Sequence, residues 1–232
     1  MSNFVFPPVD IPSAAVRGTE ARYAVRRIFC VGRNYADHAR EMGSDPTREP
    51  PFYFTKPATA LTPSGSTVPY PTETKNYHYE MELVLALGAP VFKVTPEAAV
   101  AAIWGYAAGL DMTRRDLQAA AKAAGKPWDT AKGFDQSAIL GEIVRVADIG
   151  RLDKGAITLA VNGVEKQRGD LADMIWNSAE IVSNLSYLYH LHPGDLIYTG
   201  TPAGVGAVVP GDVLAGRIEG LGEIHLTVGP AE

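Results

Sequence analysis

The sequence predicts an α+β fold in which strands outnumber helices. Short apolar segments of strand length recur along the chain, whereas only about four segments have helical periodicity. Asn162 and Gly163 separate two such segments, residues 157–161 and 164–168, and this dipeptide is typical of a tight β-hairpin. Helical segments do not alternate regularly with strands. We therefore expect hairpins and mixed pairing in place of a doubly wound parallel sheet.

The composition is that of an ordinary soluble globular protein. The 232 residues are 46% hydrophobic and 20% charged, and the formal net charge is -5. An acidic chain without a basic run is not expected to bind nucleic acid, and no apolar segment reaches membrane-spanning length. The start of the chain lacks the features of a signal peptide, and the single thiol, Cys30, lies in an apolar segment typical of a packed core. These observations favour a cytoplasmic protein without nucleic-acid or membrane partners.

The first residues are expected to be an appendage to one large domain. Three prolines among the first twelve residues predict an extended lead-in over residues 1–25 that packs on the domain surface. Residues 26–232 are expected to form a single domain, because no repeat, low-complexity segment or convincing linker divides them. Its first strand is predicted at residues 26–31.

A short helix is predicted directly after that strand, over residues 33–43. Asn34 is the expected N-cap and Gly43 the expected stop. His38 and Glu41 are three residues apart, so they share one face of this helix. The polar residues 44–51 that follow contain prolines and are expected to form a loop that could act as a lid.

Strands and two helices are predicted for the middle of the chain. The strands are expected at residues 52–55, 78–87 and 106–110. Thr95, Pro96 and Glu97 predict a helix start, because threonine caps, proline suits the first position and glutamate favours the positive helix end. A second helix over residues 114–124 is rich in alanine and ends at Gly125.

The last part of the chain contains the longest predicted helix. Asn177 and Glu180 have the spacing of a capping box, and the helix is expected to end near residue 190. The other predicted elements are a loop at 126–134, an apolar segment at 139–144, a strand at 196–199, a glycine-rich loop at 200–206, and strands at 213–219 and 223–228.

Two carboxylates, Glu80 and Glu82, interrupt an otherwise apolar strand. Successive side chains of a strand point to opposite faces, so Glu80 and Glu82 share one face. Neighbouring like charges repel, and a buried carboxylate without a partner costs several kcal/mol. A cation between them would resolve both problems. The competing interpretation is a solvent-exposed strand face, on which charged residues are ordinary.

Asp111 follows the predicted strand at 106–110 and is a candidate third carboxylate. An oxygen-rich cluster without suitable cysteines favours Mg²⁺ or Mn²⁺ over zinc. His78, next to the glutamates, could change that ligand set. Asp111 could equally cap the turn before the helix at 114–124, and spacing alone leaves both interpretations open.

Five short motifs occur in order along the chain. They are VGRNY at 31–35, EME at 80–82, GLDMTRRDLQ at 109–118, AKGFD at 131–135 and YTGTPAGVG at 198–206. In order and spacing they resemble the fumarylacetoacetate hydrolase family, from about residue 26 to the end of the chain. The resemblance is strongest to the short acylpyruvate and fumarylpyruvate hydrolases. It implies a β-rich mixed roll with peripheral helices, like the C-terminal domain of the family, and a homodimer.

The resemblance also implies a metal site and a reacting pair. Glu80, Glu82 and Asp111 match the family's ligands for Mg²⁺ or Mn²⁺. His38 and Glu41 match the dyad on a lid helix that activates water. Residues 26–232 would then be the catalytic domain.

Four further residues match positions around the substrate. Lys132 matches the cation beside it, and Arg115, Gln118 and Thr201 match groups that bind its carboxylate or carbonyl oxygens. The implied activity is metal-dependent hydrolysis of the carbon–carbon bond of 3-acylpyruvates. The expected reaction converts fumarylpyruvate to fumarate and pyruvate, a step of aromatic degradation by the gentisate route.

Two other functions are compatible with the same residues. One is oxaloacetate decarboxylation on the same site, and the other is a noncatalytic module that binds a metal or a small acid. Without the resemblance, His38 and Lys132 could be ordinary surface residues, and Arg115 and Gln118 could lie on a solvated helix face.

Overall fold

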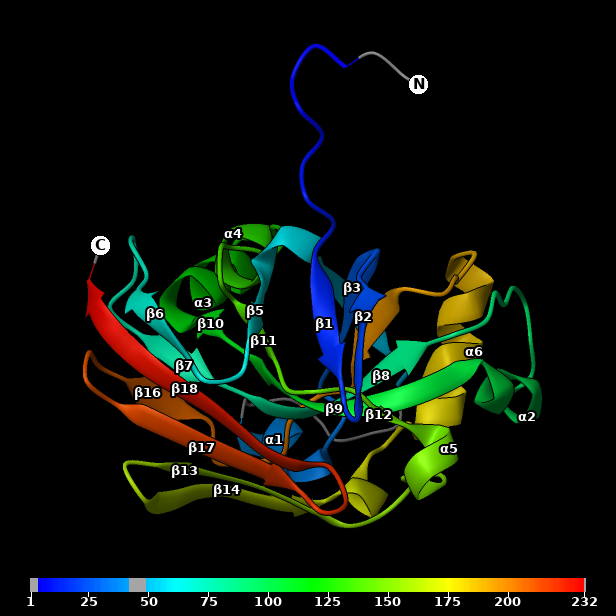
Figure 1. Ribbon diagram of the computed structural model, residues 1–232. Helices are drawn as coiled ribbons and strands as arrows, with labels where there is room; N and C mark the ends of the chain where they lie inside the picture. The colour runs from blue at the N-terminus through cyan, green and yellow to red at the C-terminus, as the bar shows by residue number, and fades with distance from the viewer. Residues whose placement is uncertain (1–3, 42–48, 232) are drawn as a thin grey trace.

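The computed structural model describes residues 4–41 and 49–231, and most of its strands belong to two sheets (Figure 1). The larger is eight-stranded, with neighbours in the order β4-β3-β15-β8-β9-β11-β5, and β12 also pairs with β9. Its strands are β3 (Arg27–Gly32), β4 (Phe52–Lys56), β5 (Leu61–Pro63), β8 (Met81–Leu87), β9 (Ile103–Asp111), β11 (Ala138–Leu140), β12 (Val144–Arg145) and β15 (Asp195–Tyr198).

The second sheet has five strands in the order β14-β13-β17-β18-β6. They are β6 (Ser66–Tyr70), β13 (Ala156–Val161), β14 (Val164–Asp170), β17 (Val213–Ile218) and β18 (Gly222–Ala231). A three-stranded sheet contains β7 (Tyr77–Tyr79), β10 (Thr113–Arg114) and β16 (Gly206–Val208). Antiparallel pairs dominate, and β3–β15, β5–β11 and β6–β18 are parallel, so the pairing is mixed.

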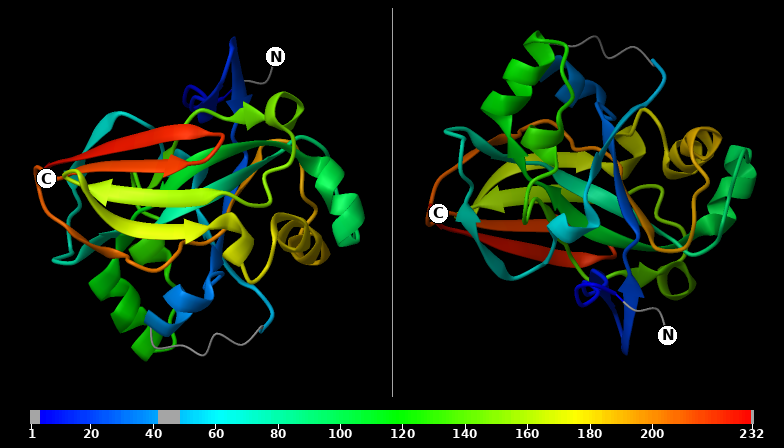
Figure 2. Two further views of the ribbon diagram at one scale, coloured as in Figure 1. Left: turned by 90° about the horizontal axis from the view of Figure 1, so that it is seen from below. Right: turned by 90° about the horizontal axis from the view of Figure 1, so that it is seen from above.

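The helices are short and lie around the sheets (Figure 2). They are α1 (Ala36–Glu41), α2 (Pro96–Ala99), α3 (Arg115–Ala123), α4 (Asp129–Lys132), α5 (Val146–Ile149), α6 (Ser178–Leu188) and the 3-10 turns η1 (Ala58–Ala60), η2 (Val100–Ala102) and η3 (Leu171–Asp173). In both views of Figure 2, α1 and α3 project from the same side of the sheets, while α2 and α6 lie together at another edge. The predicted α+β class with peripheral helices is confirmed. Within the described residues, no helix is long and apolar enough to cross a membrane.

Strand β8 lies in the middle of the larger sheet and is buried on both faces. Met81, Leu83 and Leu85 belong to the main apolar cluster, whereas Val84 and Ala86 pack into a second cluster on the other face. The predicted alternation is therefore confirmed. The interpretation of its charged face as solvent-exposed is wrong, because Glu80 and Glu82 are only 5% and 1% exposed.

The turn and the capping box that the local sequence predicts are both present in the structure. Asn162 and Gly163 have φ of 51° and 77° and turn β13 into β14. Asn177 accepts a hydrogen bond from the Glu180 amide at 3.0 Å, and the Glu180 side chain accepts one from the Asn177 amide at 3.1 Å, which completes the capping box of α6. Cys30 is fully buried, and burial raises the pKa of its thiol, as expected for a core residue.

Three predictions at element level need correction. The lead-in is extended only to residue 12, because β1 (Ser13–Val16) and β2 (Thr19–Ala24) form a hairpin. Figure 1 shows the preceding segment pointing away from the sheets, and Phe4 and Val5 are 65% and 92% exposed, so it does not pack on the surface. The expected loop at 126–134 contains α4. The third correction is that Asn34 does not cap α1, because its side chain bonds to Trp176 and Thr199. The predicted stop at Gly43 and most of the predicted lid loop lie outside the described residues.

Gly109 on β9 allows β8, β9 and β15 to pack closely beneath the carboxylates. A Cβ at this position would lie 2.5 Å from Val84 Cγ2 and 2.7 Å from Tyr198 Cε1. Both neighbours are buried, so neither can move into solvent. The absence of a side chain here thus holds β9, and with it Asp111, close to β8.

We expect Gly109→Ala to lower the free energy of unfolding by about 1–3 kcal/mol, because the added methyl overpacks a closed core. Urea unfolding measures it. Gly141→Ala is the matched control, since its Cβ would meet Ala108 O at 3.3 Å, and we expect a smaller loss. Equal stability of Gly109→Ala and the unmodified protein would contradict this packing account.

Candidate active site

Three carboxylates meet where β7, β8 and β9 adjoin. Glu80 lies at the break between β7 and β8, Glu82 on β8, and Asp111 at the end of β9. Glu82 pairs with Gly109, and the Asp111 amide donates to Glu80 O at 2.9 Å, so the strand register brings the three side chains together. One oxygen from each lies within 4.8 Å of the others, and all three residues are buried.

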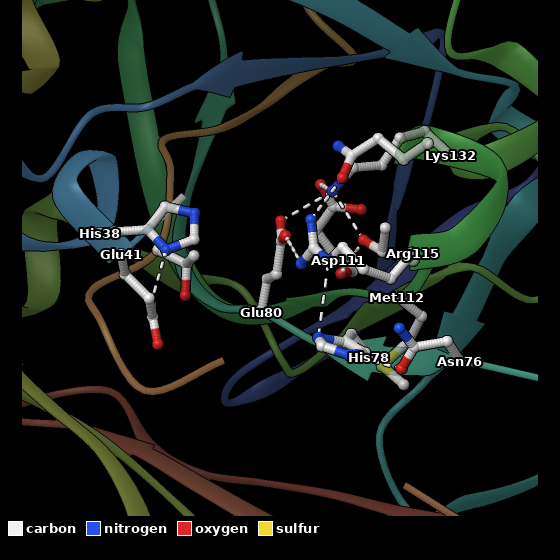
Figure 3. A network of polar contacts seen from close by, with 12 residues as sticks. His38, Glu41, Asn76, His78, Glu80, Asp111, Met112, Arg115 and Lys132 are labelled. Carbon is white, nitrogen blue, oxygen red and sulfur yellow. Dashed lines mark hydrogen bonds and ion pairs between the residues drawn. The ribbon is translucent and has the colours of Figure 1, made fainter. Parts of the chain in front are cut away.

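Cations from three other elements compensate two of the carboxylates, and Figure 3 shows two of these cations, Lys132 and Arg115. Lys132 Nζ on α4 lies 2.7 Å from Glu80 Oε2 and 2.7 Å from Asp111 Oδ2, and Arg115 on α3 pairs with Glu80 Oε1. Lys56 Nζ on β4 lies 2.8 Å from Asp111 Oδ1 and forms a buried ion pair with it. Burial alone would raise the pKa of Glu80, but the charges of Lys132 and Arg115 outweigh it and hold that pKa well below its usual range.

Glu82 is the exception in this cluster. Its Oε2 accepts a hydrogen bond from the Gly200 amide at 2.8 Å, but none of the ion pairs among the described residues includes it. Burial, followed by the charges of Asp111 and Glu80, raises the pKa of Glu82 well above its ordinary value. The cluster therefore holds one carboxylate that the protein's own cations do not compensate.

Asp111 and His78 do not have the alternative roles that spacing left open. Asp111 does not cap α3, whose first turn has no side-chain cap. His78 Nε2 hydrogen-bonds Asn76 Oδ1 at 2.8 Å, and its Nδ1 accepts a hydrogen bond from Arg115 Nε at 3.4 Å. Burial and the Arg115 charge lower the pKa of His78 to about 4, so at neutral pH it is an uncharged support for Arg115.

The His38–Glu41 pair faces this cluster from α1. His38 Nδ1 lies 3.2 Å from Glu41 Oε2, and both Glu41 oxygens accept from the Gly204 amide at 3.2 Å. Figure 3 shows the pair on one side of Glu80, with Lys132 and Arg115 on the other. His38 is only 6% exposed, so it is not an ordinary surface histidine.

A cavity of about 270 Å³ opens above the carboxylates. Of the predicted site residues, those that line it are His38, Glu80, Glu82, Arg115, Gln118, Lys132 and Thr201. Lys132, Arg115 and Gln118 are buried, which excludes the solvated-face interpretation. The structure thus brings all the predicted groups to one place, with Glu41 and Asp111 directly behind the lining residues.

Three buried residues of the site were missed by sequence reasoning. Lys56 pairs with Asp111, Gln167 donates to Thr201 Oγ1 at 2.8 Å and accepts from the Met81 amide at 3.0 Å, and Asn34 donates to Thr199 O at 2.8 Å. Lys56 ends a strand of aromatic residues, and this position could have indicated a buried lysine. Gln167 lies among polar residues on β14, and nothing in that stretch indicates that its side chain is buried.

A buried acidic cluster at the floor of a cavity, faced by a histidine–carboxylate pair, is typical of an enzyme that acts on small molecules. Comparison with known proteins specifies the class. The family model described as fumarylacetoacetate (FAA) hydrolase C-terminal matches residues 27–229. The chain belongs to this family, as the motif order predicted.

Within the family, the chain is similar to fumarylpyruvate hydrolases and to an oxaloacetate tautomerase. The chain is 56% identical over 188 residues, 81% of its length and 97% of the relative's, to fumarylpyruvate hydrolase of a Ralstonia species. The crystal structure of fumarylpyruvate hydrolase from Pseudomonas aeruginosa in complex with Mn²⁺ and pyruvate has a TM-score of 0.96 and 49% identity, covering 98% of this chain and 100% of that one. The chain is also 38% identical to Escherichia coli oxaloacetate tautomerase YcgM, over 88% of its own length and 93% of that protein's.

We expect Glu82→Gln to stabilise the metal-free protein at neutral pH by about 1–2 kcal/mol, because it removes a buried, uncompensated charge. The folded-state pKa of Glu82 is raised, so the protein loses stability as pH rises from the ordinary glutamate pKa of the unfolded chain toward the raised value, and the advantage of the variant should shrink in mild acid. Urea unfolding with a chelator present measures both.

Glu20→Gln on the exposed strand β2 is the control and should change nothing. A Glu82→Gln variant that is less stable than the unmodified protein at neutral pH would contradict an uncompensated carboxylate at this position.

Proposed function

We propose that this protein hydrolyses the carbon–carbon bond of acylpyruvates, with fumarylpyruvate cleaved to fumarate and pyruvate, and that it requires Mg²⁺ or Mn²⁺. The observation that supports this most is the buried set of Glu80, Glu82 and Asp111 at the floor of a cavity that His38 also lines. The similarity to fumarylpyruvate hydrolases points to the same substrate.

The residues present fit a hard divalent cation. All three candidate ligands offer carboxylate oxygens, the donors that Mg²⁺ and Mn²⁺ prefer. Glu82 has no cationic partner among the described residues, whereas Asp111 Oδ1 is ion-paired with Lys56 Nζ at 2.8 Å. When bound, a divalent ion would supply Lewis acidity to the 2-oxo acid end of the substrate.

The charges at the floor support an anionic substrate. Lys56, Lys132 and Arg115 place three positive charges around the carboxylates of Glu80 and Asp111, and the raised pKa of Glu82 opposes its ionisation without a metal. The cluster therefore carries no net negative charge by itself. With a divalent cation added it would be positive, which favours a 2-oxo acid that brings negative charge.

His38 is the proposed general base. Glu41 engages Nδ1 of His38, which fixes the imidazole tautomer and leaves Nε2 to take a proton from water. The Gly204 amide in turn holds both Glu41 oxygens. The attacked group is the carbonyl distant from the 2-oxo acid, and its carbon–carbon bond then breaks as the pyruvate carbon receives a proton.

The proposed substrate contacts are Lys132, Arg115, Gln118 and Thr201. The Lys132 ammonium already contacts Glu80, Asp111 and Thr113, each at 2.7 Å, so it can donate to an oxyanion only by releasing one of them. Arg115 pairs with Gln118 on the same helix face, and together they present donors for a carboxylate. Thr201, held by Gln167, completes this side of the cavity.

A second candidate, oxaloacetate chemistry, is favoured by the 38% identity to the oxaloacetate tautomerase of Escherichia coli. The same floor could bind the 2-oxo acid of oxaloacetate, and tautomerisation needs proton transfer but no attacking water. Decarboxylation would instead release carbon dioxide. We also propose a homodimer, which mass measurement in solution by light scattering would test.

One substrate panel tests the function. Fumarylpyruvate, acetylpyruvate and oxaloacetate are assayed with Mg²⁺, Mn²⁺ or a chelator. We expect equal amounts of fumarate and pyruvate with either metal and no turnover under full chelation. Activity that survives full chelation would contradict the metal requirement. Enolisation of oxaloacetate without any diketone cleavage would favour the second candidate.

His38→Ala should lower kcat for fumarylpyruvate by about 10²–10⁴-fold with little change in KM, because general-base catalysis contributes on that order. Glu41→Gln should lose less, since it orients the base. His225→Ala is the matched control, because His225 is exposed and pairs with Glu223. If both dyad variants kept full activity on every diketone, His38 and Glu41 would not be the reacting pair.

A further inference from the structure

The cavity above the carboxylates carries a second group of positive charges at its outer part. Arg33 and Lys122 line it together with the floor residues, and both are exposed. Among the described residues, neither side chain forms a hydrogen bond or an ion pair, and the Arg33 guanidinium only lies over the Phe52 ring at 5.9 Å. Two cations without anionic partners thus remain at the mouth of the cavity.

Helix α3 connects the floor of the cavity to this mouth. Arg115, Gln118, Ala119 and Lys122 all line the cavity, and their spacing places them on one helix face. Arg115 contacts Glu80 at the floor, whereas Lys122 is exposed seven residues later. At 1.5 Å per residue, the two are about 10 Å apart along the axis.

The turn before α1 holds Arg33 at the same mouth. Arg33 has φ of 58°, a left-handed conformation that costs a non-glycine residue free energy. The next residue, Asn34, is fully buried and fixes this turn: it donates to Thr199 O and accepts from the Trp176 amide at 2.7 Å. The strained backbone is therefore imposed by its surroundings, and it carries a charged side chain toward the cavity.

The wall between floor and mouth is apolar and aromatic. Phe54 and Trp128 line it, with ring centroids 5.9 Å apart, and Val31 lines it as well. The two rings are tilted by 54° to each other and give an apolar surface for a conjugated chain, with no hydrogen-bond donor or charge from Phe54 or Val31 for a carboxylate. The cavity accordingly has a polar floor, an apolar middle and a cationic mouth.

We propose that Arg33 and Lys122 form a carboxylate-binding subsite that selects acylpyruvates whose acyl group itself ends in a carboxylate. This inference rests on the proposed function. The 2-oxo acid end lies at the floor, the unsaturated acyl chain lies against Phe54 and Trp128, and the far carboxylate receives charge-assisted hydrogen bonds at the mouth. Acetylpyruvate has no far carboxylate, and oxaloacetate is too short to place one at the mouth.

The test compares fumarylpyruvate with acetylpyruvate in Arg33→Asn, Lys122→Met and the double variant. Asparagine tolerates the left-handed conformation of residue 33, so folding is retained, and thermal unfolding confirms it. We expect each single change to raise KM for fumarylpyruvate about tenfold and the double change to raise it further, with kcat nearly unchanged. The kinetics on acetylpyruvate should not change.

Two controls separate this subsite from a general charge effect. Lys126→Met removes the same charge from a residue that lines a neighbouring cavity, and it should leave both substrates unaffected. Arg33→Lys should restore part of the affinity for fumarylpyruvate.

The outcomes distinguish this inference from the proposed function. A double variant with the unmodified preference for fumarylpyruvate over acetylpyruvate overturns the subsite, as does a parallel loss on both substrates. If the unmodified protein cleaves neither diketone, the proposed function itself fails. Cleavage of acetylpyruvate alone retains the hydrolase and rejects the subsite.

Discussion

The burial of three neighbouring carboxylates is the constraint on which the rest of this structure depends. Antiparallel pairing of β8 with β9 forces Glu82 and Asp111 together, and burial makes their charges costly. Lys56, Lys132 and Arg115 offset that cost from β4, α4 and α3. Segments far apart in sequence therefore converge on one floor because each contributes a cation to it.

The cations compensate the three carboxylates unequally, and this inequality is chemically useful. The cations contact Glu80 and Asp111, while Glu82 receives only a backbone amide. A core selected for stability alone would not retain such a group, because an uncompensated buried charge lowers stability. The site is thus prepared for a further cation, and the protein accepts a less stable floor in order to bind one.

Local sequence features could be predicted well, and residues fixed by distant contacts could not. The alternation through Glu80 and Glu82, the Asn162–Gly163 turn and the Asn177 capping box each depend on neighbours within a few residues. Lys56 and Gln167 contact residues more than thirty positions away, so the sequence around them does not identify their partners. Predicting Asn34 as a cap failed for the same reason: its side chain bonds to Thr199 and Trp176 instead of to its own helix. The five motifs located the site because they preserve the order of such distant partners.

The turn at residues 32–34 couples the proposed chemistry to the proposed selectivity. Helix α1 covers only Ala36–Glu41 in the described chain, and a helix so short is not stable without tertiary contacts. Its position is set by Asn34 at its start and by the bonds from the Gly204 amide to Glu41 at its end. The same Asn34 holds Arg33 in its strained conformation at the cavity mouth. A shift of this turn would therefore move the base at the floor and the cation at the mouth together, so binding of the far carboxylate and alignment of His38 share one structural support.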